Sequence, residues 1–93
     1  MIVRFSPSAQ ADIQAIFDFI AQDNPVMAGR VVAIIEQATD RLSLFPHSGR
    51  MGAVEGTREL VIPRLPYITV YTVAEDAVDI IAVFHAAQDR LRW

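Results

Sequence analysis

Hydrophobic positions in the first half of the chain follow a helical period. The apolar run from Ile2 to Phe5 is typical of a short strand. Ser6 and Pro7 follow it as a capping residue and a first-turn proline, which together start a helix. Apolar side chains then recur at three- and four-residue spacing, at Ile13, Ile16, Phe17 and Ile20. The pattern predicts a first helix over about residues 7–22.

A second helix begins almost at once. Asn24 and Pro25 repeat the signal of a cap followed by a proline, so the two helices must form a hairpin. Its apolar seam has the alternating spacing of a helix that packs along one side. The seam consists of Ala28, Val31, Ile35, Ala38, Leu42 and Phe45. Pro46 is expected to end this helix.

The second half of the chain changes to the pattern of a sheet. Residues 46–57 contain three of the four glycines and no apolar period, which predicts a loop. Runs of β-branched and aromatic residues then predict three antiparallel strands, joined by turns at 63–66 and 74–77. These strands are Arg58–Ile62, Tyr67–Val73 and Val78–His85. The order β-α-α-β-β-β predicts one α+β domain, residues 1–93, with a helical hairpin packed on a small, mainly antiparallel sheet.

Strict alternation would give the last strand two distinct faces. One face would carry Asp79, Ile81, Val83 and His85, and the other Val78, Ile80, Ala82 and Phe84. His85 would then mark the place where a buried strand reaches solvent. In the preceding strand, Tyr67, Thr69 and Tyr71 are expected to share a face, with the tyrosine hydroxyls at its rim.

Composition adds an expectation about partners and location. Hydrophobic residues make up 53% of 93 residues, more than one small core hides easily, so we expect a partner to cover part of the surface. The chain shows neither a signal-peptide core nor an apolar stretch of membrane-spanning length, which favours a cytoplasmic protein without a membrane partner. The absence of cysteine excludes disulfides and thiolate chemistry.

The charges count against unaided binding to nucleic acid. All eight basic residues are arginine, the net charge is −3, and the isoelectric point is near 5.1. Phosphate neutralisation needs a basic face, so no direct binding to DNA by this chain alone is expected. The two histidines lie far apart, without carboxylates at ligand spacing, and the glycine loop is followed by a strand, not a helix. Neither a metal nor a cofactor is expected.

The order of several segments resembles the RelE/ParE family of type II toxin–antitoxin toxins over essentially the whole chain. These segments are "FSPSAQADIQAIFDFI", "FPHSGRMG", "GTREL", "PYITVY" and "VDIIAVFHAAQDR". The resemblance implies a growth-inhibiting toxin that is neutralised by a small cognate antitoxin. We expect the antitoxin to cover an apolar groove between the hairpin and the sheet, through a helix or an added strand.

The family resemblance leaves two molecular targets open. RelE-like members are ribosome-dependent endoribonucleases that cut mRNA, whereas ParE-like members inhibit DNA gyrase and cut nothing. A nuclease would use His85 as acid or base, with Arg58 and Arg64 stabilising the phosphate. Nuclease members commonly carry an arginine at the position of Ile68. Arg58 has a structural alternative, which is to hold the loop by hydrogen bonds to carbonyls.

The gyrase interpretation is favoured by the acidic isoelectric point, the absence of lysine and Ile68. It needs no catalytic residue, and it requires a docking surface rich in arginine and aromatic side chains. Candidate contacts with the target or the antitoxin are Arg50, Arg58, Arg64, Gln88, Arg90, Arg92 and Trp93. A third possibility is a family member that has lost toxicity and persists as a binding partner of its antitoxin.

Overall fold

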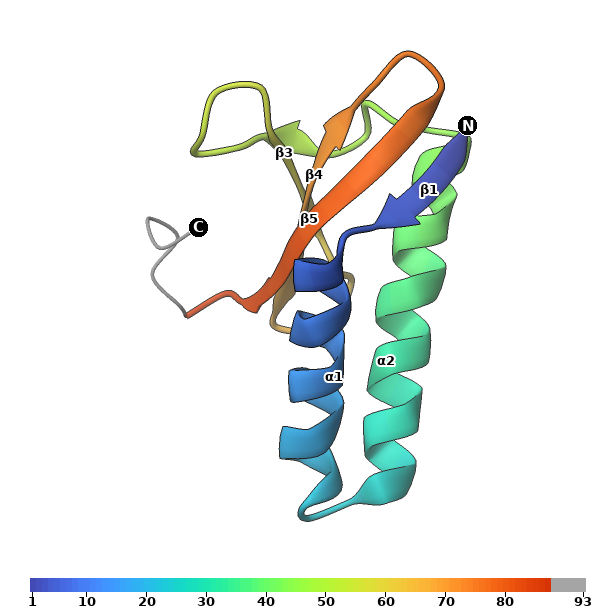
Figure 1. The fold of residues 1–93 in the computed structure, drawn as a ribbon. Coiled ribbons are helices and arrows are strands. Elements are labelled where there is room, and N and C mark those ends of the chain that lie inside the picture. Colours follow the sequence, from blue (N-terminus) through green and yellow to red (C-terminus); the bar gives the residue numbers. More distant parts are fainter. Residues whose placement is uncertain (88–93) are drawn as a thin grey trace.

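The computed structural model describes residues 1–87 as two helices and a five-stranded mixed sheet (Figure 1). The elements are β1 (Ile2–Phe5), α1 (Pro7–Ala21), α2 (Pro25–Asp40), the 3₁₀ turn η1 (Arg41–Ser43), β2 (Arg50–Met51), β3 (Arg58–Val61), β4 (Tyr67–Val73) and β5 (Ala77–His85). The strand order is β1-β5-β4-β3-β2. Only the β1–β5 pair is parallel, so the predicted α+β fold with a mainly antiparallel sheet is confirmed.

Both helices begin where the sequence predicts. The Ser6 side chain accepts a hydrogen bond from the N–H of Ala9, and Asn24 accepts one from the N–H of Met27. In each case the next residue is a proline, whose missing N–H costs nothing in the first helical turn. The two caps fix where α1 and α2 begin, and the helices lie side by side as an antiparallel pair (Figure 1).

The main core lies between the hairpin and one face of the sheet. Buried Ile35 and Leu42 from the helical layer meet Tyr71 and Ile80 of the sheet. Inside this layer the hydroxyls of Thr39 and Thr69 lie 3.3 Å apart and satisfy each other. As expected, Tyr67, Thr69 and Tyr71 share this helix-facing side of β4. A second buried cluster, formed by Ile68, Val70, Ala82 and Phe84, belongs to the opposite face.

The strict alternation predicted along the last strand is wrong. The register shifts between Val70 and Tyr71, which pair with Ala82 and Ile80, so Ile81 is an extra residue in β5. A β-bulge of this kind reverses the faces beyond it. Val78, Ile80 and Val83 therefore share the main core, whereas Ala82 and Phe84 lie on the other face.

The N-terminus of α1 supports β5 near this bulge. β1 pairs with β5 only as far as Ile80, so within residues 1–87 this edge of β5 has no neighbouring strand after that point. The Ser6 hydroxyl donates to the carbonyl of Ile81 at 3.2 Å, and the N–H of Val83 donates to the Asp12 carboxylate at 3.0 Å. Side chains of the helix thus satisfy backbone groups that a strand would otherwise bind.

The end of the second helix also differs from the prediction. α2 ends at Asp40, and η1 follows with fewer residues per turn than an α-helix. The change of period keeps Leu42 buried but moves Phe45 off the seam, where its side chain is 58% exposed. The loop predicted over 46–57 contains the short strand β2, which the sequence pattern did not indicate. None of the described helices is long and apolar enough to cross a membrane.

Candidate functional site

The loop that follows η1 is held to the sheet by a buried tyrosine. The Tyr71 hydroxyl donates to the carbonyl of Pro46 at 2.8 Å and accepts from the N–H of Gly49 at 2.9 Å. Tyr71 is fully buried in the main core, so its ring fixes the position of the hydroxyl. Two backbone groups of the loop are thereby satisfied at one point.

Arg58 adds a second attachment to the same loop. Its Nη1 donates to the carbonyl of Gly49 at 2.9 Å and to that of His47 at 3.3 Å. The structural alternative considered for Arg58, hydrogen bonds to loop carbonyls, is therefore present. A guanidinium engaged in this way holds the loop backbone against the sheet.

A third attachment is an ion pair with one buried partner. Arg50 on β2 faces Glu59 on β3, and its Nη2 and Nε lie 2.9 and 3.1 Å from Oε1 of that carboxylate. The Glu59 side chain is 1% exposed, whereas that of Arg50 is 49% exposed. Separating the two partners would leave the buried Glu59 carboxylate uncompensated, which costs free energy. The ion pair therefore favours the position that Arg50 occupies in the structure. We call residues 46–52, with these three attachments, the clamped loop.

The candidate nuclease residues are not brought together. Arg58 pairs with Tyr71 and His85 pairs with Tyr67, on opposite sides of β4. Four residues along the strand and two strand spacings across it separate their Cα atoms by about 16 Å. The guanidinium of Arg58 is moreover directed at the loop carbonyls.

The remaining nuclease candidates occupy separate places. Arg64 is exposed in the turn between β3 and β4 and has a positive φ of 66°, which is uncommon outside glycine. His85 is exposed at the end of β5, its ring lies nearly perpendicular to that of Tyr67 at a centroid distance of 5.5 Å, and its Nδ1 accepts from the N–H of Ala87. Ile68 is 3% exposed within the second cluster, so this position provides a buried apolar side chain and no cation.

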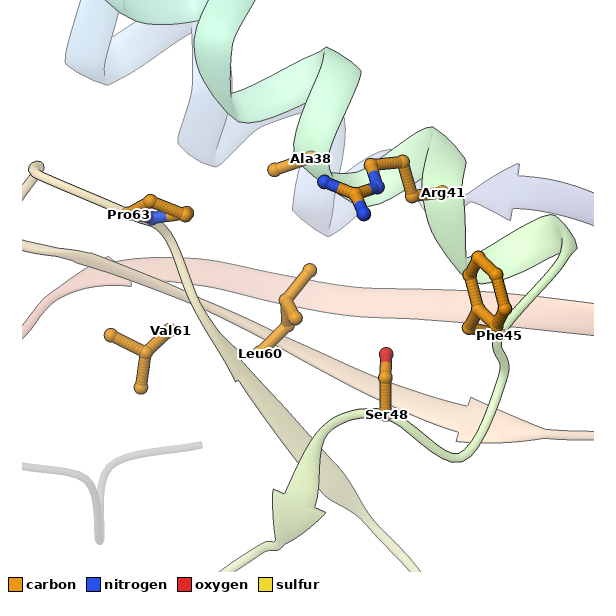
Figure 2. A pocket seen from close by; sticks show the side chains of 7 residues that line it. All are labelled: Ala38, Arg41, Phe45, Ser48, Leu60, Val61 and Pro63. Carbon is orange, nitrogen blue, oxygen red and sulfur yellow. The ribbon is translucent and has the colours of Figure 1, made fainter.

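A groove of about 430 Å³ opens between α2 and β3 (Figure 2). It is lined by Ala38, Arg41, Phe45, Ser48, Leu60, Val61 and Pro63. This is the location in which the sequence predicts an apolar groove, between the hairpin and the sheet. Phe45 contributes to it because the 3₁₀ turn removes this ring from the core. The helical pattern gave no signal for that displacement.

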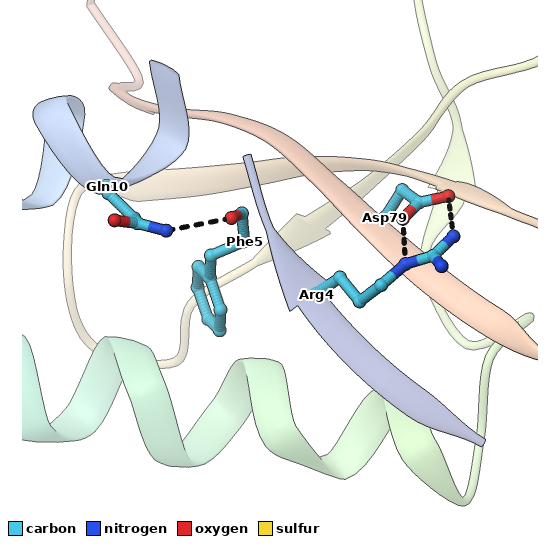
Figure 3. A network of polar contacts seen from close by, with 4 residues as sticks. All are labelled: Arg4, Phe5, Gln10 and Asp79. Atoms are coloured by element: carbon cyan, nitrogen blue, oxygen red, sulfur yellow. Dashed lines mark hydrogen bonds and ion pairs between the residues drawn. The ribbon is translucent and has the colours of Figure 1, made fainter. Parts of the chain in front are cut away.

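A second ion pair lies away from the groove and the clamped loop. Arg4 and Asp79 face each other across β1 and β5, with Nε and Nη2 at 2.7 and 3.0 Å from the two carboxylate oxygens (Figure 3). The hydrogen bond from Arg4 is the main cause that lowers the pKa of Asp79 below its ordinary value. Both side chains are solvent-exposed, so this pair links two strands without forming a site.

The remaining candidates are the other predicted contact residues and possible metal ligands. Gln88, Arg90, Arg92 and Trp93 lie outside the described residues. Within residues 1–87, no group of three or more histidine, cysteine, aspartate or glutamate side chains is arranged to hold a metal ion. The described candidates are therefore the clamped loop, the groove beside it, and the exposed end of β5 at His85.

Comparison with curated proteins gives relatives that are named as toxins. The chain is 42% identical over 86 residues to the putative toxin Y4kP of Sinorhizobium fredii, which covers 92% of this chain and 88% of that protein. It is 40% identical over 80 residues to toxin RelE2 of Caulobacter vibrioides, covering 86% of this chain and 89% of the relative. The relatives thus match almost the whole described fold.

Solved structures of similar fold come from toxin–antitoxin systems. A chain from the chromosomal ParDE system of P. aeruginosa superimposes with a TM-score of 0.82 at 25% identity, covering 91% of this chain and 95% of that one. A chain from the RelBE2 toxin–antitoxin complex of Mycobacterium tuberculosis gives a TM-score of 0.59 at 25% identity, with 94% and 92% covered.

The family model described as the ParE toxin of the type II toxin–antitoxin system parDE matches residues 3–90. The match includes both helices and all five strands. The resemblance on which the sequence interpretation depends is confirmed, and the chain belongs to the ParE toxin family of type II toxin–antitoxin systems.

Proposed function

We propose that this protein is a toxin that stops growth by binding DNA gyrase and that a cognate antitoxin neutralises it. The match to the ParE toxin family and the likeness to a chain of the ParDE system support this proposal. Fold alone does not decide the target, because function depends on the site. The contacts of the described side chains therefore distinguish between gyrase and the ribosome.

One observation carries the choice of target: the cation that a nuclease would need is engaged elsewhere. Cleavage of RNA through its own 2′-hydroxyl requires an acid or base and positive groups around one phosphate. Arg58 donates to two loop carbonyls instead, about 16 Å along the sheet from His85. At the position where nuclease members carry an arginine, Ile68 is buried. The set does not form a phosphate-binding cluster.

The clamped loop suits recognition of another protein better. It presents the half-exposed guanidinium of Arg50 beside Met51, whose side chain is 70% exposed. Arginine and methionine are enriched at protein interfaces. Because Glu59, Arg58 and Tyr71 already fix this loop, binding would lose little conformational entropy. We place the gyrase contacts at Arg50 and its neighbours, in the loop that Arg58 holds against the sheet. We expect further contacts at Arg64 and in the segment from Gln88 to Trp93.

The alternative is a ribosome-dependent mRNA endoribonuclease that uses His85. One observation favours it: the imidazole is exposed at the end of β5, and both the ring of Tyr67 and the N–H of Ala87 orient it. An oriented and accessible histidine is a reasonable acid or base. The same contacts would also stabilise the position of a histidine at the end of a strand that has no catalytic role.

The two functions differ in the damage that a cell sustains. We would induce the toxin without antitoxin in bacteria and measure DNA breakage and mRNA integrity in the same cultures. The proposal predicts gyrase-linked DNA breaks, intact mRNA and unchanged growth arrest by His85→Ala. Cleaved mRNA with intact DNA, together with loss of arrest in His85→Ala, would refute it. Normal growth with folded toxin would indicate a member that has lost toxicity.

A further inference from the structure

We propose that Arg50 binds a carboxylate of the target protein, with Val61 as the apolar neighbour of that contact and the buried Glu59 as the residue that positions Arg50. This inference rests on the proposed function and names the chemistry by which the clamped loop recognises its target. The contact lies on the side of the sheet that faces away from the helices. Three observations support it: a shared face, unused donors on one guanidinium, and an exposed apolar side chain beside it.

The three residues of the proposed contact share one face of the sheet. Glu59 pairs with Val70, and Val61 pairs with Ile68. Both of these partners on β4 belong to the second cluster, on the face opposite the helices. Arg50 on β2 pairs with Glu59 from the other side. Residues that pair directly project to the same face, so Arg50 and Val61 are diagonal neighbours at positions about 7–8 Å apart.

Arg50 has hydrogen-bond donors that the fold does not use. A guanidinium carries five N–H donors, and Oε1 of Glu59 accepts from Nε and Nη2 at 3.1 and 2.9 Å. Within residues 1–87, Nη1 of Arg50 makes no hydrogen bond. One N–H of Nη1 and the second N–H of Nη2 form the parallel pair of donors that a carboxylate accepts bidentately. Because the Arg50 side chain is 49% exposed, a partner can reach this end of it.

Glu59 determines which way these unused donors point. Its side chain is 1% exposed, so it holds the Nε side of the guanidinium against the sheet. A side chain that is already oriented loses less conformational entropy on binding than a mobile one. Glu59 is therefore a positioning residue, which acts on the target only through Arg50.

Val61 adds an apolar side chain to the same face. It is 49% exposed at the end of β3. Leu60 and Val61 leave the strand in opposite directions, and only Leu60 points towards Arg41 across the groove (Figure 2). A half-exposed valine beside an oriented arginine is the combination of apolar and charged groups that protein interfaces use.

The surroundings of Arg50 favour a carboxylate of a protein over a phosphate of nucleic acid. Glu59 places a buried negative charge 2.9 Å from the guanidinium and offsets part of its charge. The nearest strand arginine, Arg58, lies on the helix-facing side, and Arg4 pairs with Asp79 at the other edge of the sheet. Binding to a nucleic-acid backbone needs several cations together. A single guanidinium beside a valine fits an acidic residue with an apolar neighbour.

The test reverses the charge added at position 61. Val61→Glu places a carboxylate that competes for the donors of Arg50 and repels an acidic partner, whereas Val61→Lys removes the same valine and adds attraction. Val26→Glu and Val26→Lys are the matched controls, because Val26 is 67% exposed at the start of α2. Affinity for purified gyrase free of DNA would be measured at low and high salt, after circular dichroism has shown that each variant is folded.

We expect Val61→Glu to bind roughly 100-fold more weakly than Val61→Lys, with a smaller ratio at high salt. The two variants of Val26 should differ by less than about twofold. Arg50→Lys keeps the charge and loses the paired donors, so it should weaken binding by about tenfold. Equal affinities of the two variants at position 61 would overturn the proposal. A difference that appears only when plasmid is added would overturn it as well, because the partner group would then be a phosphate.

A double-mutant cycle tests the positioning role of Glu59. Glu59→Gln should weaken gyrase binding by about fivefold, because a neutral amide holds the guanidinium less firmly than a carboxylate does. In an Arg50→Gln background the same change should have no further effect. An equal loss in both backgrounds would show that Glu59 acts on the fold in general, and it would overturn the positioning role.

A growth experiment separates this inference from the choice of target. Without antitoxin, Val61→Lys should arrest bacteria at lower expression than Val61→Glu. If gyrase proved insensitive to the wild type while growth arrest kept this order with intact mRNA, the gyrase proposal would fail and the carboxylate contact would stand for another protein. Equal inhibition of gyrase by both variants would overturn the contact and leave the gyrase proposal standing. Cleaved mRNA with insensitive gyrase would overturn both.

Discussion

Gly49 has no room for a side chain. A Cβ atom at this position would lie 2.5 Å from the Tyr71 hydroxyl and 2.8 Å from the carbonyl of Glu59. Its N–H is also the group that the hydroxyl accepts from. The loop can approach the sheet this closely only because Gly49 carries a hydrogen atom in place of a Cβ. The small size of Gly49 is therefore a condition for the clamped loop.

Gly49→Ala should destabilise the protein by roughly 1–3 kcal/mol, because the added methyl group displaces either the Tyr71 ring or the loop backbone. Gly29→Ala is the matched control, since nothing lies within 4 Å of a Cβ added there and alanine favours a helix interior. Urea denaturation of both variants measures the difference. Equal stability of the two would show that the loop does not press on the sheet.

The Arg4–Asp79 pair makes a small part of the stability dependent on pH. Arg4 lowers the pKa of Asp79 from 3.8, so the folded chain releases this proton more readily than the unfolded chain. The contribution is present above pH 3.8 and is lost as the pH falls below that value. Asp79→Asn should lower the melting temperature at pH 7, with the gap to wild type closing in acid. A gap that does not narrow at all as the pH falls below 3.8, or one as large for Glu75→Gln, would exclude this ion pair as its cause.

At the scale of elements, local signals predicted the helices and the longer strands, whereas contacts between strands decided the rest. Ser6 and Asn24 cap their helices through neighbours three residues away, so a sequence window contains the whole interaction. The bulge at Ile81 arises from pairing with β4, and no periodicity in β5 reveals it. β2 depends on pairing with β3, where Arg50 meets the buried carboxylate of Glu59. The hydrogen bonds of Arg58 to loop carbonyls agree with the structural alternative that the sequence suggested, whereas the pairing of Arg50 with Glu59 appears only in the fold.

The joint between α1 and β5 is a contact of this non-local kind. Asp12 accepts a hydrogen bond from the N–H of Val83, beyond the end of β1. Asp12→Ala leaves that donor unsatisfied and should cost roughly 1–3 kcal/mol. Asp12→Asn keeps an acceptor oxygen and should retain most of the stability, as measured by urea denaturation. If the two substitutions were equally harmful, the carboxylate's charge rather than the hydrogen bond would be responsible.

At the scale of the whole molecule, the distribution of arginines connects the fold to the proposed function. The chain has a net charge of −3, so its cations act locally and do not form a general basic face. Three of the described arginines are engaged within the fold, and two of the remaining three flank the groove. The groove and the clamped loop adjoin each other, because Phe45 and Ser48 line the groove and the carbonyl of Pro46 between them accepts from Tyr71.

The central claim is that the target is gyrase and that His85 has no catalytic part in the toxicity. Its most direct test is the supercoiling of relaxed plasmid by purified gyrase, titrated with this protein freed of antitoxin, as wild type and as His85→Ala. We expect both proteins to inhibit supercoiling near stoichiometry, with cleaved or relaxed DNA accumulating, and added antitoxin to restore supercoiling. Gyrase that remains fully active in the presence of protein that still arrests growth would contradict it, and the nuclease alternative would take its place.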